Sequence, residues 1–155
     1  MSIAALITWL ITALGGFYLL GTWLARGGVR QQQTKTTRFP APVIFGHFLL
    51  AAVGLVVWII YVAADTKALA WTAFIILLPV ALLGFTMLAR WIPLYRAGTP
   101  AHTVRPAGSA AATTAQEPAV PAERSFPLPV VLGHGLFAVI TLVLVLLTAL
   151  GVGGS

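Results

Sequence analysis

Apolar residues fall into four long runs along the chain, separated by segments that are polar or rich in glycine and proline. The runs cover Ile3–Ala25, Pro42–Ala63, Leu69–Trp91 and Pro129–Leu150. At about 1.5 Å per residue, a helix of this length spans the roughly 30 Å hydrocarbon layer of a bilayer. The strict alternation of apolar and polar residues found in barrel strands is absent. The pattern therefore predicts an all-α fold, an integral membrane four-helix bundle.

The composition agrees with insertion into a membrane. Hydrophobic residues make up 59% of the 155 residues and charged residues only 8%, and the mean hydropathy is +0.99, all outside the soluble range. The chain has no cysteine, which excludes disulfides, thiolate metal sites and covalent haem attachment. The net charge of +6 comes from dispersed cations without a basic stripe interleaved with aromatic residues, so nucleic acid is not an expected partner.

The cations indicate how the helices are oriented. Eight of the nine lie in or beside the first and third connections, in the order Arg26, Arg30, Lys35, Arg38, Arg90, Arg96, Arg105 and Arg124. Only Lys67 lies in the short second connection. By the positive-inside rule, loops 26–41 and 91–128 are cytoplasmic and both termini lie outside. We expect a multi-pass protein of the bacterial plasma membrane, whose first run is retained because no basic n-region precedes it.

One connection differs in character from the rest of the chain. Segment 97–124 combines glycines, prolines and an Ala/Thr-rich stretch with almost no apolar side chain to bury. This composition predicts a disordered cytoplasmic loop. The chain thus divides into residues 1–96 with the first three helices, the loop, and residues 125–155 with the fourth helix and a short outer tail. Together they form one membrane domain.

A block of sequence occurs twice, 87 positions apart: FPAPVIFGH ends at His47 and FPLPVVLGH ends at His134. Each block opens an apolar run with a proline pair, which suits a helix start because the first turn leaves its amide protons unbonded. A weaker similarity relates segment 19–26 to segment 82–90. We therefore expect two parallel-related helical hairpin repeats around a pseudo-twofold axis along the membrane normal. This axis places the two histidines at equal depth in the cytoplasmic half.

Two interpretations of the histidines are open. In the first, each imidazole hydrogen-bonds a group on a neighbouring helix and serves packing alone. In the second, the two rings face each other and supply both axial ligands of one haem b, with small residues beside them and cations near the propionates. The residues of this cofactor-binding hypothesis are His47, His134, Gly46, Gly133, Arg38 and Arg124.

No catalytic residue and no metal centre is predicted. Two histidines without a thiolate or carboxylate in the runs are too few ligands for a zinc or copper site. Asp65, Glu117 and Glu123 all lie outside the apolar runs, which leaves no acid–base pair or proton relay within the membrane. His102 lies in the loop, where we expect a solvated side chain.

Glycine and proline interrupt two runs near their middle. Gly15-Gly16 in the first run and Pro79 in the third permit either a close approach of a neighbouring helix or a local bend. Close packing is the simpler interpretation, and a hinge in a transporter is the other.

The closing helix, HGLFAVITLVLVLLTALG from His134 to Gly151, resembles that of small uncharacterised multi-pass membrane proteins of actinobacteria. The resemblance covers little more than this helix. It implies a location in the bacterial plasma membrane and no particular activity, substrate or cofactor.

These observations favour a non-catalytic accessory or scaffolding subunit of a larger membrane complex. The chain has the features needed for insertion and packing, and few that turnover requires. Its expected partners are the lipid bilayer and other membrane subunits or a second copy, with no cofactor needed. The alternative is a bis-histidine haem b electron carrier or sensor that uses His47 and His134. A third possibility is a small transporter or channel subunit.

Overall fold

The computed structural model describes residues 1–98 and 120–152 of the chain. Over these residues the protein is helical, and four helices are long and apolar enough to cross a membrane: α1 (Ser2–Ala25), α3 (Ala41–Ala64), α4 (Lys67–Arg96) and α5 (Leu128–Ala149). The short α2 (Gly28–Gln33) and the 3₁₀ helix η1 (Ala122–Ser125) lie in the connections between them.

The ends of the long helices follow from local sequence. Pro42 and Pro129 lie in the first turns of α3 and α5, which confirms that the duplicated proline pairs mark helix starts. At the far end of α5, Gly151 has a φ of +80°, and its amide and that of Val152 bond back to carbonyls of the last turn, as in a Schellman motif. Only α4 departs clearly from its predicted extent, because it continues five residues beyond Trp91 to Arg96.

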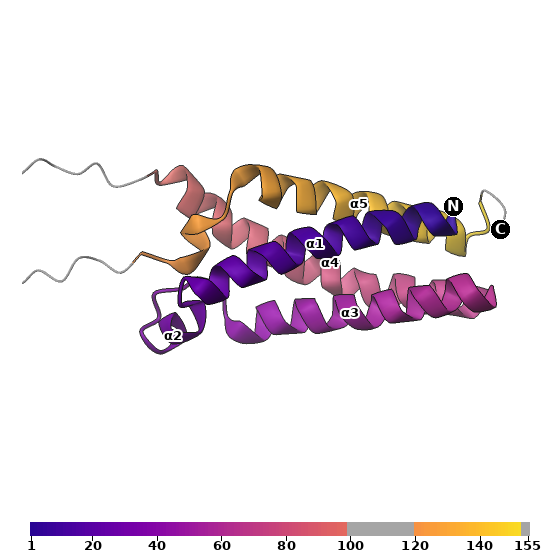
Figure 1. Ribbon diagram of the computed structural model, residues 1–155, viewed down its shortest axis with the longest axis horizontal. Helices are drawn as coiled ribbons and strands as arrows, with labels where there is room; N and C mark the ends of the chain where they lie inside the picture. The colour runs from indigo at the N-terminus through magenta and orange to yellow at the C-terminus, as the bar shows by residue number, and fades with distance from the viewer. Residues whose placement is uncertain (99–119, 153–155) are drawn as a thin grey trace, which may run out of the picture.

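The long helices lie side by side and run alternately up and down the bundle (Figure 1). The two chain ends therefore lie at one end of the bundle, while α2 and η1 lie at the other, which we call the connection end. Helix α1 packs mainly against α5, and α3 mainly against α4. The contacts of α1 with α3 and of α4 with α5 are less extensive, so the bundle consists of two tightly packed helix pairs that meet along a seam.

Buried apolar side chains form two separate clusters along the bundle. The cluster near the chain termini is built around Trp9 and Trp58, and Trp58 donates a hydrogen bond to the carbonyl of Ser2 at 3.2 Å. The cluster at the connection end contains the indoles of Trp23 and Trp91. The buried core therefore consists of two parts, separated along the length of the bundle.

The end of the segment predicted as a disordered loop carries a short helix. Residues 99–119 lie outside the described part of the chain, but Ala122–Ser125 form η1. Glu123 within it is fully buried, and its carboxylate accepts hydrogen bonds from the hydroxyl of Thr37 at 2.9 Å and from the backbone amide of Arg38. Trp91 Nε1 donates to the carbonyl of Glu123 at 3.1 Å. These bonds join the first connection, η1 and α4.

Candidate functional site

The two predicted histidines meet inside the bundle. His47 is the seventh residue of α3 and His134 is the seventh residue of α5, so each lies one and a half to two turns from the connection end of its helix. Their ring centres are 6.3 Å apart, and the ring planes are inclined by 60°. The rings belong to different helix pairs and therefore face each other across the seam.

Each imidazole is oriented by a backbone carbonyl of the helix that packs against its own. Nδ1 of His47 lies 2.9 Å from the carbonyl oxygen of Val80 in α4, and Nδ1 of His134 lies 2.9 Å from that of Thr12 in α1. A carbonyl oxygen only accepts hydrogen bonds, so Nδ1 must carry the proton in both rings. Nε2 of each neutral ring then keeps its lone pair, which is the tautomer that binds a metal through Nε2.

Glycines in the facing helices allow this close approach. A Cβ added at Gly16 of α1 would lie 3.1 Å from Cε1 of His134, and one at Gly84 of α4 would lie 3.3 Å from Cε1 of His47. A Cβ added at Gly15 would lie 3.3 Å from the Cβ of His134. The close-packing interpretation of Gly15-Gly16 is therefore confirmed. The sequence similarity between segments 19–26 and 82–90 aligns Gly84 with Gly21. In the structure Gly84 corresponds instead to Gly16, because each of these two glycines lies against a histidine ring.

The glycines that precede the histidines have a different environment. A Cβ at Gly133 would meet no atom within 4 Å, and one at Gly46 would meet only Cδ1 of Leu83, at 3.9 Å. Neither glycine is therefore packed tightly against another helix, in contrast to Gly16 and Gly84. Along α3 and α5 the histidines also lie between the two buried clusters, with Ile44 belonging to one cluster and Val145 to the other.

The two arginines of the haem hypothesis lie at the connection end, and neither hydrogen-bonds an imidazole among the described residues. Arg38 has an exposed side chain, and its carbonyl accepts a hydrogen bond from Nη1 of Arg90 at 2.9 Å. Arg124 lines a groove beside the end of α4. The structure therefore brings together His47 and His134, with Gly46 and Gly133 beside them, but not the two guanidinium groups.

Sequence reasoning missed Val80, Thr12 and Gly84 as parts of the site. The first two act through their backbone carbonyls, which side-chain type does not reveal. Gly84 carries no distinguishing signal beyond being a small residue in an apolar run. Only the helix pairing in three dimensions identifies all three.

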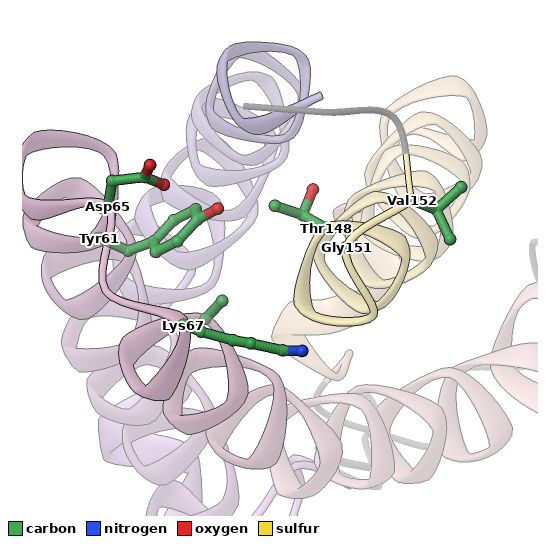
Figure 2. Close-up of a pocket in the computed structure, with 7 residues that line it drawn as sticks. Tyr61, Asp65, Lys67, Thr148, Gly151 and Val152 are labelled. Carbon is green, nitrogen blue, oxygen red and sulfur yellow. The ribbon is translucent and has the colours of Figure 1, made fainter.

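A separate small cavity of about 160 Å³ lies at the end of the bundle that holds the chain termini (Figure 2). Its lining comes from the α3–α4 turn and the end of α5, and consists of Tyr61, Asp65, Lys67, Ala70, Thr148, Gly151 and Val152. The Lys67 side chain extends from the start of α4 toward α5. This volume is below that of typical small-molecule sites, and its two charged residues are exposed, so it does not indicate an active site.

The described residues contain no group of three or more histidine, cysteine, aspartate or glutamate side chains that could hold a metal ion. The chain matches no family model, no curated protein and no solved structure. Chemically, the histidine pair offers two neutral imidazoles of fixed tautomer, with ring centres 6.3 Å apart across the seam.

Proposed function

We propose that the chain is a membrane haem b protein in which His47 and His134 are the two axial ligands of one iron. The observation that carries the proposal is the 6.3 Å separation of the ring centres. A metal–imidazole bond is about 2 Å long and the centre of an imidazole lies about 1 Å from its nitrogen, so rings on opposite sides of one metal have centres about 6 Å apart. The Nδ1–H bonds to Val80 and Thr12 support the same role, because they leave both Nε2 atoms free to coordinate.

Haem fits this ligand set better than a bare ion does. A closed zinc site takes four protein ligands, and the described residues offer no such group. A porphyrin supplies four nitrogens itself, so the protein needs to add only two axial imidazoles. With no cysteine in the chain, the haem would be held without thioether bonds, as haem b.

The seam between the helix pairs suits a flat macrocycle. A haem lies perpendicular to the line between its axial nitrogens, and here that line joins α3 of one pair to α5 of the other. The haem plane would therefore follow the seam, where the two pairs pack less closely than the helices within each pair do.

We also propose that the bundle crosses the bacterial plasma membrane four times, with its connection end in the cytoplasm. Seven of the eight cations in the described residues lie at that end, as the positive-inside rule requires. The recurrence of the FPxPVxxGH block, with a carbonyl bond and a glycine contact made by both histidines, supports an origin from two helical hairpins.

Two axial histidines favour electron transfer over binding of oxygen. Haem iron with both axial positions filled has no open site for a gaseous ligand, and it cycles between its ferric and ferrous states. The histidines lie roughly 9 Å from the start of their helices, at about 1.5 Å per residue, and hence near the connection end. The resulting function is that of a one-electron carrier or sensor, which exchanges electrons on the cytoplasmic side.

The experiment is to express the chain with an ample supply of haem precursor, purify it in mild detergent and record visible spectra before and after dithionite. We expect one haem per chain and a reduced α-band of b type, both lost in His47→Ala and in His134→Ala. His102→Ala is the matched control, because it removes the remaining histidine. A protein that stays colourless contradicts the proposal and favours the accessory subunit. Haem bound equally by all three variants also contradicts it.

A further inference from the structure

The groove beside the end of α4 is distinct from the histidine site. It has a volume of about 500 Å³ and is lined by Leu94, Tyr95, Arg96, Gly98 and Arg124. The last turn of α4 forms one wall and η1 the other. It therefore opens at the connection end of the bundle, beyond the apolar part of the helices.

The charges around this groove are almost all positive. In the described residues the connection end carries seven cations, at positions 26, 30, 35, 38, 90, 96 and 124, and one carboxylate, that of Glu123. Glu123 is fully buried, and its two oxygens accept hydrogen bonds from Thr37 and Arg38. Arg96 and Arg124 thus both line the groove, and no carboxylate among the described residues lines it.

Arg124 also has hydrogen-bonding capacity that the described residues leave unused. Its Nη2 is buried and has no hydrogen-bond partner among the described residues, and a buried donor without an acceptor is unfavourable. If the guanidinium group turns toward the groove that Arg124 lines, an acceptor bound there can satisfy this donor. Phosphate oxygens are well suited to the task, because guanidinium and phosphate groups form paired, charge-assisted hydrogen bonds.

We propose that this groove binds a phosphate group, supplied by the headgroup of an anionic phospholipid or by free phosphate. Basic pockets at the cytoplasmic ends of membrane helices bind such headgroups. Tyr95, 51% exposed, adds an aromatic ring of the kind enriched at the headgroup level.

The test measures the thermal unfolding midpoint of the purified chain in detergent micelles doped with phosphatidylglycerol, with phosphatidylcholine of the same acyl chains, or with inorganic phosphate alone. We expect phosphatidylglycerol to raise the midpoint by about 3 °C or more, as a ligand well above its dissociation constant does, and phosphatidylcholine to leave it unchanged. A similar rise with inorganic phosphate alone identifies the free anion as sufficient, and no rise identifies the lipid as the source.

The variants decide whether the groove is responsible. Arg96→Gln and Arg124→Gln should each reduce the shift, whereas Arg30→Gln, an exposed cation at the same end, should retain it. Arg96 is exposed, so its variant stays informative if the Arg124 variant does not fold. Equal shifts with both lipids would overturn the proposal, and so would a full shift in the Arg96→Gln variant.

Discussion

The two imidazoles are oriented by backbone carbonyls and by glycines, and not by polar side chains. A carbonyl of Thr12 or Val80 holds each Nδ1, and a glycine lies against each ring edge. Bonds of this kind to a coordinating histidine fix its tautomer and direct Nε2 at the metal. If the histidines hold a haem as proposed, the residues around them matter for its binding as much as the histidines themselves do.

Gly16→Leu tests this at the residue scale. Its side chain would collide with His134, since a Cβ there already lies 3.1 Å from the ring. We expect haem occupancy to fall about tenfold or more, in line with the loss caused when the surroundings of a metal-binding histidine are disturbed. The measurement is the ratio of haem absorbance to protein in the purified variant.

Gly21→Leu is the matched control for this substitution. Gly21 lies in the same helix, and a Cβ there meets no atom within 4 Å. Both variants gain the same helix propensity, so they differ only in contact with the histidine. Equal haem content in the two would show that Gly16 does not support His134.

The sequence pattern identifies some residues of the candidate site and misses others. It identifies His47 and His134, because polar side chains are rare in these runs and the flanking block is duplicated. It does not identify Gly84, since many small residues occur in apolar helices and only the contact with His47 distinguishes this one. The role of Arg38 and Arg124 beside a haem stays a prediction, because no cofactor position is defined by the helices alone.

At the scale of elements, the connections are more structured than their composition suggests. Helix α2 packs back on α1, where a Cβ on Gly28 would overlap the Trp23 indole. Gln31 of α2 hydrogen-bonds the carbonyl of Val120 at 2.9 Å and the amide of Ala122 at 2.8 Å.

The apolar runs predict the long helices within one or two residues at most ends, because length and hydropathy determine them. The bonds around η1 join residues more than 80 positions apart, which no local pattern reveals.

Glu123→Ala tests the role of η1 in joining the connections. The substitution leaves the hydroxyl of Thr37 and the amide of Arg38 without their acceptor, at a cost of about 1–3 kcal/mol for each unbonded donor. We expect a clearly lower unfolding midpoint in detergent. Glu123→Gln keeps one acceptor oxygen and should lose less. Asp65→Asn, at an exposed carboxylate of the opposite end, should change little, because asparagine tolerates the positive φ of this position. An equal loss in all three variants would argue against the buried bonds.

At the scale of the whole molecule, the division into two helix pairs gives the bundle its seam. Both histidines project into it from the connection end, where most cations also lie. Because the helices are antiparallel, with the start of α1 and the end of α5 at one end of the bundle (Figure 1), the α1–α3 and α4–α5 connections lie together at the other end. The sequence predicts this topology from its cations, whereas which helices pair closely emerges only in the structure.

The absence of cysteine makes the topology easy to test with single introduced thiols. Arg30→Cys lies at the connection end and Asp65→Cys at the other, and both positions are exposed. We expect a membrane-impermeant maleimide to label Asp65→Cys in intact spheroplasts and Arg30→Cys only after lysis. The reverse pattern would place the connection end outside and contradict the proposed orientation.

The most direct measurement is the electron paramagnetic resonance spectrum of the oxidised, haem-loaded protein, compared with His47→Gly and His134→Gly. We predict a low-spin ferric signal from two imidazole ligands in the wild-type chain. Each variant should give a high-spin signal, which added imidazole returns to low spin by occupying the vacated position. A variant that remains low-spin without imidazole, or a wild-type chain that retains no haem, would contradict coordination of one iron by His47 and His134.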